Sequence, residues 1–113
     1  MINQVTPVEV FEERERHNKL VKQFNTKAIE LAEKQATYDK LRSVATLQER
    51  ENKIPITIIK TIVDGREDVA QAKFEVSVCK AMLDTIDRAI DDSKWQQKVL
   101  MDQISREWGR NGN

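Results

Sequence analysis

The strongest constraint on the fold of this chain is a seven-residue repeat of small and branched apolar residues in its second half. The repeat has unbroken spacings of three and four residues, and its members are Val69, Ala72, Val76, Cys79, Leu83, Ile86 and Ile90. Such spacing places the residues on one face of an α-helix, and a strict heptad favours a left-handed supercoil against a partner helix. We therefore predict a long helix over 67–108 that ends at Gly109, with 109–113 as a tail.

The first half of the chain contains no proline or glycine between Pro7 and Pro55. Thr6, Pro7 and Glu9 fit a capping box that starts a helix, so we predict an irregular start over 1–7 and a helix over 8–52. Its apolar stripe consists of Leu20, Phe24, Ala28, Leu31, Tyr38, Leu41 and Ala45, with Gln35 interposed. Glutamates four residues before a base predict ion pairs within the helix, namely Glu12 with Arg16, Glu15 with Lys19 and Glu30 with Lys34.

The connecting segment, 53–66, is the least determined part of the pattern. Pro55 interrupts the first helix, because proline has no amide hydrogen and restricts the residue before it. The next residues, 56–63, are mostly β-branched, which favours a strand, yet no second strand-like run is present to pair with one. We therefore favour a short helix, capped by Thr57, that buries Ile58, Ile59, Ile62 and Val63. Asp64 and Glu67 repeat the capping-box spacing before the last helix.

These elements predict an all-α protein, an antiparallel two-helix coiled-coil hairpin with a short helix in the connecting segment, forming one helical domain over 1–113. The last helix has more apolar residues than one seam uses. We expect a second surface, which joins copies of the chain into a helical bundle or ring, made of Phe74, Val78, Met82, Trp95 and Val99. Partial coverage of this surface by the connecting segment is the alternative.

The composition argues against several classes of protein. Among 113 residues there is one cysteine, Cys79, and one histidine, His17, so neither an internal disulfide nor a Cys/His zinc site is expected. An unpaired thiol suits a reducing compartment, and the start of the chain lacks the pattern of a signal peptide, so we expect a cytoplasmic protein. There is no glycine-rich phosphate loop. We expect Cys79 to be a buried small hydrophobe, His17 to lie at the surface and the aspartates of 84–92 to be solvated, so we predict no enzyme and no cofactor.

Basic and aromatic residues near the two ends of the chain suggest a different activity. Antiparallel folding would bring the two groups together, and their members are Arg14, Arg16, Lys19 and Lys22 near the start and Lys94, Lys98, Arg106 and Arg110 near the end, the latter interleaved with Trp95 and Trp108. Basic side chains with stacking aromatics are typical of single-stranded nucleic-acid binding. The formal net charge is zero, with 19 basic and 19 acidic residues. The alternative is that the tryptophans anchor an interface and the bases only add solubility.

The order of elements resembles that of small phage recombination-mediator proteins of the UvsY type. The similar stretches are 27–34, 38–42, the connecting segment 58–63 and the pattern Ala72-Lys73-Phe74 followed by Leu83, Asp84 and Ile86, together covering roughly 18–105. The resemblance implies a ring-like homo-oligomer in the host cytoplasm that binds single-stranded DNA and helps to load a recombinase onto strands covered by single-strand-binding protein. The neutral charge departs from that family. The competing hypothesis is a coiled-coil adaptor, assembly protein or host-protein inhibitor that acts through a protein–protein interface.

Overall fold

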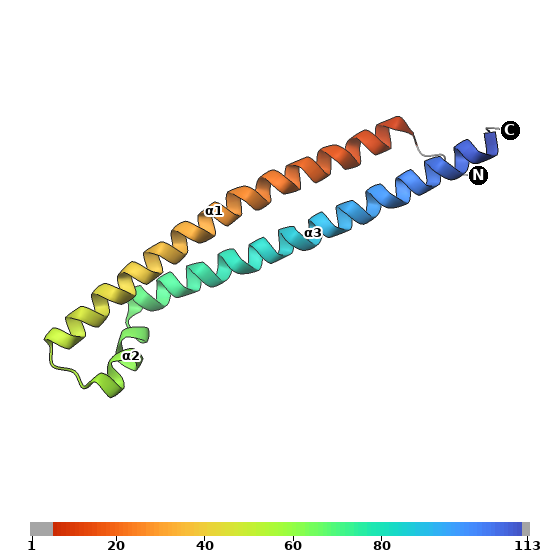
Figure 1. Cartoon of the computed structure of the whole chain (residues 1–113). Helices are drawn as coiled ribbons and strands as arrows, with labels where there is room; N and C mark the ends of the chain where they lie inside the picture. Colours follow the sequence, from red (N-terminus) through yellow and green to blue (C-terminus); the bar gives the residue numbers. More distant parts are fainter. Residues whose placement is uncertain (1–5, 112–113) are drawn as a thin grey trace. The chain divides into compact units, whose positions relative to one another are not determined.

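The computed structural model describes the backbone of residues 6–111 and the side chains of residues 6–109. This part of the chain forms three helices, α1 (Pro7–Glu51), α2 (Ile56–Asp64) and α3 (Glu67–Asn111), and it contains no strand (Figure 1). The prediction of an all-α protein is therefore confirmed for the described residues. The capping box at the start of α1 is also confirmed, because the amides of Thr6 and Glu9 donate to each other's side chains at 3.3 and 3.2 Å.

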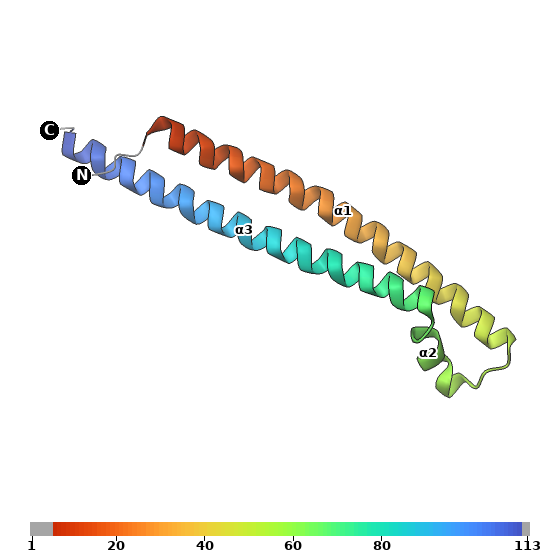
Figure 2. The ribbon, with the colours of Figure 1, turned by 180° about the vertical axis from the view of Figure 1, so that it is seen from behind.

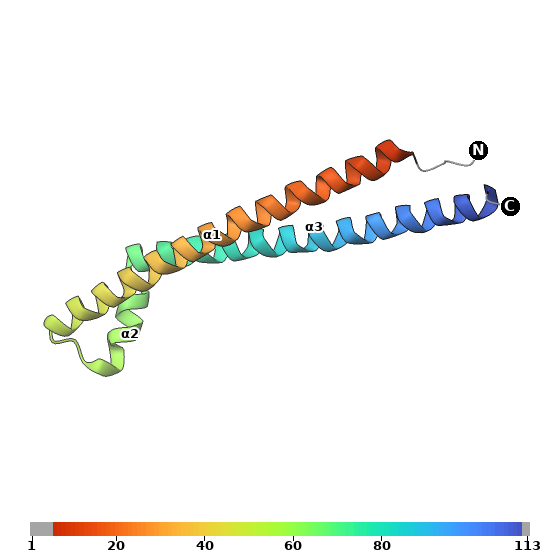
Figure 3. The same ribbon diagram turned by 45° about the horizontal axis from the view of Figure 1, so that its top comes forward.

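The chain packs as two compact units. Unit 1 combines the start of α1 with the end of α3, in the ranges Met1–Asn25 and Asp84–Asn113. Unit 2, Thr26–Leu83, contains the rest of α1, all of α2 and the start of α3. Figures 2 and 3 show from two directions that α2 lies in the connection between α1 and α3.

The core of unit 2 lies where α2 packs against the two long helices. It consists of the buried residues Ala45, Ile59, Val63 and Val69, against which Tyr38, Leu41 and Ile54 pack. The predicted burial of Ile58 is wrong, since 45% of this residue is exposed. Thr57 is not a cap either, because α2 already begins at Ile56. The residue before the helix is Pro55, and no side chain there caps the helix. Proline supplies the extended backbone that starts the helix, with φ −56° and ψ 136°.

The end of α1 is a Schellman motif rather than a simple break at proline. The amide of Ile54 donates to the carbonyl of Glu49 at 3.1 Å, and the amide of Lys53 donates to that of Arg50 at 3.0 Å. Lys53 adopts the left-handed conformation that this motif requires, with a φ of 61°. Ile54 follows it and packs against the core of unit 2.

The two ends of α3 also differ from expectation. Asp64 does not form a capping box with Glu67, because its carboxylate instead accepts a bond from Arg42 Nε at 3.2 Å. At its other end α3 continues through Gly109 to Asn111, so the predicted stop at Gly109 is wrong. Glycine costs only about 1 kcal/mol within a helix, and nothing lies within 4 Å of where a Cβ would be at this position.

The predicted seam of α3 is confirmed. Its apolar members are buried or half-buried in their units, with Val69, Ala72, Val76, Cys79 and Ile90 at 9% exposure or less. The seam continues at Ser93, which is completely buried, and at half-buried Gln97. The stripe of α1 from Leu20 to Ala45 is likewise half-buried or buried.

The ion pairs predicted within α1 are replaced by others. Arg16 pairs with Glu13 at 3.0 Å instead of Glu12, and Glu30 pairs with Lys27 at 2.8 Å instead of Lys34. Lys34 reaches α3, where its Nζ lies 3.3 Å from Glu75. Arg16 and Lys34 thus bind carboxylates on α3, although helix periodicity predicted partners for them on α1.

Candidate functional site

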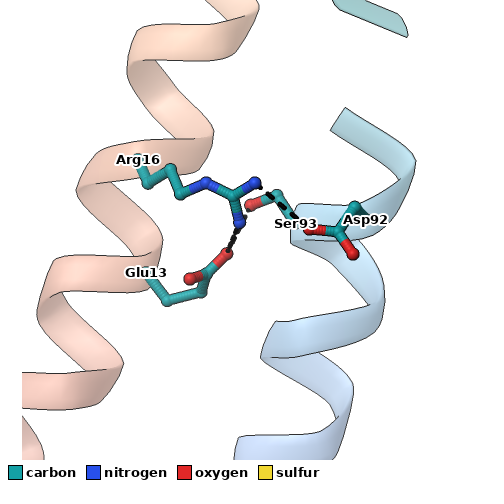
Figure 4. A network of polar contacts seen from close by, with 4 residues as sticks. All are labelled: Glu13, Arg16, Asp92 and Ser93. Carbon is teal, nitrogen blue, oxygen red and sulfur yellow. Dashed lines mark hydrogen bonds and ion pairs between the residues drawn. The ribbon is translucent and has the colours of Figure 1, made fainter. Parts of the chain in front are cut away.

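Unit 1 is held together by a polar network between α1 and α3 (Figure 4). One carboxylate oxygen of Glu13 accepts hydrogen bonds from the Ser93 hydroxyl at 2.9 Å and from Arg16 at 3.0 Å. The other arm of the Arg16 guanidinium donates to Asp92 at 3.1 Å. The bond to Asp92 is the main reason that the pKa of Arg16 is raised above its ordinary value, with Glu13 adding to it.

This network changes the interpretation of the basic residues near the start of the chain. Arg16 was predicted to contact nucleic acid, but two carboxylates already occupy its guanidinium. The other predicted residues, Arg14, Lys19, Lys22, Lys94, Lys98 and Arg106, are exposed and belong to unit 1, and no ion pair is found for them among residues 6–109. Arg110 lies in α3, but its side chain is outside the described residues. The fold thus places both basic groups in the same unit.

An exposed aromatic residue lies between two of these bases. Trp95 is 59% exposed, and the Nζ of Lys98 lies 6.0 Å from the centroid of its ring. Lys94 precedes it directly and is exposed as well. Trp108, further along α3, is 75% exposed. An exposed indole with one ammonium group close to its ring can stack on a base and contact an adjacent phosphate.

The charge balance of unit 1 limits what this surface can do on its own. The acidic residues of the unit outnumber its basic residues by one. Part of the acidic charge is compensated locally, since Glu13 and Asp92 bind Arg16, and Asp84 pairs with Arg88 at 3.0 Å. The prediction that the aspartates of 84–92 are solvated is confirmed, since all four are exposed. A single copy offers a small basic and aromatic patch rather than a broad positive face.

The seam of unit 1 also contains a residue that we expected at the surface. His17 is half-buried, and its Nδ1 atom is buried without a hydrogen-bond partner among the described residues, as is Nε2 of Gln97. His17 lies three residues before Leu20 and so continues the apolar stripe of α1 toward the start of the helix. This spacing could have predicted the burial of His17, but the basic residues around it suggested a surface position.

A second exposed surface lies on α3 in unit 2. We define the α3 stripe as Phe74, Val78 and Met82, which are 61%, 39% and 46% exposed. In the heptad register Phe74 and Val78 occupy positions on the side away from the seam. The connecting segment leaves all three exposed, contrary to the alternative that it covers them. Of the other two residues predicted for this interface, Trp95 is exposed and Val99 is half-buried.

Cys79 lies in the seam of unit 2 and is 4% exposed. Its Sγ lies 3.6 Å from a carboxylate oxygen of Glu30, and burial together with that carboxylate raises the pKa of the thiol above its ordinary value of 9.0. Lys27 donates to Glu30 at 2.8 Å and thereby lowers the pKa of the Glu30 carboxyl. Cys79 is therefore kept in the neutral thiol form, which is a poor nucleophile.

The described residues contain neither a cluster of potential metal ligands nor a helix able to cross a membrane. Within 6–111 no three or more histidine, cysteine, aspartate or glutamate side chains converge as metal ligands would. Nor does any helix there have an apolar stretch long enough to cross a bilayer.

Comparison of the chain with protein-family models, with curated proteins and with solved structures found no match.

Proposed function

We propose that this protein is a non-catalytic, self-associating accessory protein of DNA recombination that binds single-stranded DNA through unit 1 and helps to load a recombinase. The observation that supports DNA binding best is the group of Lys94, Trp95 and Lys98. Its indole is more than half exposed, one ammonium lies 6.0 Å from the ring, and neither lysine forms an ion pair within the described part of the chain.

The chemistry of this group suits an unpaired strand better than a duplex. A base of single-stranded DNA can stack on Trp95, which contributes about 1–3 kcal/mol and does not depend on the base sequence. Lys94 and Lys98 contact the neighbouring phosphates. One such patch binds weakly, and several copies joined through the α3 stripe, with Trp95 left exposed on each copy, would bind one strand with much higher affinity.

The test is fluorescence anisotropy of a labelled oligothymidine, titrated with the protein at several salt concentrations. We expect Lys94→Gln combined with Lys98→Gln to weaken binding and to lower the slope of log affinity against log salt by about 1.4, which is about 0.7 for each lysine that no longer neutralises a phosphate of a single strand. The control, Lys40→Gln with Lys73→Gln, removes two exposed lysines of unit 2 and should leave the slope unchanged. Trp95→Ala should weaken binding at every salt concentration, while Trp95→Phe keeps a stacking ring and should retain most of the affinity.

The absence of binding by the wild-type protein at low salt would contradict this proposal. So would equal reductions in affinity for the Lys94/Lys98 and Lys40/Lys73 variants, because the affinity would then reflect net charge alone.

The second candidate function is a protein adaptor or inhibitor, and the observation in its favour is the α3 stripe. Three apolar side chains at consecutive turns are suited to packing against another helix. The adaptor hypothesis predicts assembly that barely responds to salt, and no DNA binding. Sedimentation of Phe74→Ser with Met82→Ser measures the role of the stripe. Ile29→Ser is the control, because Ile29 is 62% exposed in the same unit but lies on α1.

A further inference from the structure

Unit 2 contains an open groove of about 710 Å³ between α1 and α2. The α1 wall uses one helical face between Asp39 and Arg50, and the α2 wall uses one face between Ile56 and Val63. The buried side chains of Ile59 and Val63 form the floor, whereas Leu47 and Ile56 are 58% and 83% exposed. The groove is therefore an apolar channel between two helices, with a shape suited to a third helix.

The rim of this groove carries uncompensated positive charge. Arg50 and Lys60 line it and are exposed, and neither forms an ion pair with any residue whose side chain is described. Arg42 also lines the groove, but its Nε is bound to Asp64 at 3.2 Å. Asp39, at the other end, accepts a bond from Gln35 at 3.0 Å. A helix that fits here should present apolar residues to the floor and acidic residues to Arg50 and Lys60.

The start of α1 has this combination. Val8 and Phe11 are 61% and 63% exposed, and Glu12 and Glu15 are exposed beside them. The four residues have the spacing i, i+3, i+4, i+7, so they share one face of the first two helical turns. Neither glutamate forms an ion pair within the described residues, since Arg16, the expected partner of Glu12, binds Glu13 and Asp92.

We propose that residues 8–15 of one copy dock into the α1–α2 groove of a second copy. Val8 and Phe11 then cover Leu47 and Ile56, while Glu12 and Glu15 meet Arg50 and Lys60. The segment is short enough to fit along the groove, because residues 8–15 span roughly 10 Å along the helix axis and the α1 wall from 39 to 50 spans roughly 16 Å. The docking segment carries exposed apolar and acidic residues, and the groove carries exposed apolar and basic residues, so the two surfaces are complementary in charge.

This contact has a direct consequence for assembly. The docking helix and the groove are different surfaces, so each copy in a pair retains one of each. Such a head-to-tail contact forms a closed ring or an open filament rather than stopping at a dimer. The inference rests on the self-association proposed above, but it assigns that self-association to residues outside the α3 stripe and outside the Lys94–Lys98 group.

The experiment uses complementary charge reversals in the full-length protein, measured by sedimentation velocity over a range of concentrations. The groove variant is Arg50→Glu with Lys60→Glu, and the helix variant is Glu12→Lys with Glu15→Lys. We expect each variant alone to associate at least roughly tenfold more weakly than the wild type, because two attractions become two repulsions. A 1:1 mixture of the two, and the chain with all four changes, should regain assembly. The control, Lys40→Glu with Lys73→Glu, changes two exposed lysines of the same unit outside the groove.

The outcomes separate this inference from the proposed function. Recovery in the mixture supports the contact, since two misfolded variants would not restore each other, and circular dichroism verifies their helicity. A monomeric wild type overturns the inference. The inference is also wrong if both charge-reversal variants assemble like the wild type while Phe74→Ser with Met82→Ser abolishes assembly. If the groove variant loses oligonucleotide binding but sediments like the wild type, the groove binds nucleic acid and the inference is wrong. If the wild type assembles by this contact yet binds no oligonucleotide, the inference stands and the proposed function fails.

Discussion

Ser93 and Glu13 lie on opposite helices of unit 1, with the serine hydroxyl 2.9 Å from the glutamate carboxylate. Ser93 is completely buried at a seam position that the heptad would fill with an apolar residue. Glu13 also forms an ion pair with Arg16, which compensates its charge. A buried polar pair of this kind stabilises one alignment of the two helices, because any shift in register leaves the serine without a partner.

Ser93→Ala is therefore expected to lower the free energy of unfolding by about 1 kcal/mol, the usual net contribution of one buried hydrogen bond. The reduction stays small because Arg16 still satisfies Glu13. Urea unfolding followed by circular dichroism measures it, and Ser105→Ala, at an exposed position of α3, is the matched control. Equal stability of the two variants would show that the buried bond contributes nothing.

The docking of α2 can be tested with two isoleucines of the same helix. Ile59→Ala removes a side chain that is 6% exposed in the core of unit 2, and we expect it to cost about 2–5 kcal/mol. Ile56→Ala removes the same groups from a residue that is 83% exposed, so it should change stability by no more than about 0.5 kcal/mol. Denaturation is measured at low protein concentration, where association does not contribute. A large effect at both positions would contradict the packing of α2.

Cys79 should react slowly with thiol reagents in the folded protein. Its thiol is buried, and its pKa is raised by that burial and by Glu30, so little thiolate is present at neutral pH. Iodoacetamide labelling followed by mass spectrometry measures the rate. The comparison is Ser77→Cys in a Cys79→Ala background, which places the thiol at an exposed position of the same helix. Similar rates at the two positions would mean that the seam opens readily.

The raised pKa of Cys79 also determines how the stability of the fold changes at alkaline pH. Folding favours the neutral thiol, so its contribution to stability is complete below the ordinary value of 9.0 and declines as pH rises above it. Cys79→Ala should therefore flatten the fall in stability that the wild type shows above this ordinary value. Urea unfolding at a series of pH values tests this, and parallel curves for the two proteins would refute it.

Glu30 gives the opposite, acidic effect. The hydrogen bond from Lys27 lowers the pKa of Glu30 below its ordinary 4.5, so the folded state favours the carboxylate. Its contribution to stability is present above that ordinary value and disappears as pH falls through the lowered one. As the pH falls, the free energy of unfolding should decrease less for Glu30→Gln than for the wild type. Glu33→Gln, at an exposed position of the same helix, should behave like the wild type. Identical acid profiles of Glu30→Gln and the wild type would contradict this assignment.

The parts of this fold that sequence could predict are those with a periodic signal. The seam from Val69 to Ile90 and the capping box at Thr6 depend on spacing within one helix, which the sequence displays directly. The predicted partner of Arg16 is wrong because Arg16 binds Glu13 and, across the two helices, Asp92. The contact with Asp92 depends on how α1 and α3 align, and helix periodicity carries no information on that alignment. The α1–α2 groove could not be predicted for the same reason, since its two walls come from separate elements.

The turn after α1 shows a different limit. Glycine is the usual sequence signal for a left-handed residue at the end of a helix, and this chain has Lys53 there instead. The isoleucines of the connecting segment favour a short helix, but the sequence pattern suggests Thr57 as its cap, because a proline at this place signals only a break. Pro55 in fact provides the extended backbone from which α2 starts.

Lys53 also has a consequence for how unit 2 melts. A lysine in the left-handed region has a strain that glycine would avoid, so the turn does not hold its shape by conformational preference. Its shape depends on the next residue, Ile54, which packs against the core of unit 2. The turn and that core should therefore form and dissolve in a single step, without an intermediate in which the chain reversal persists after the apolar side chains have separated.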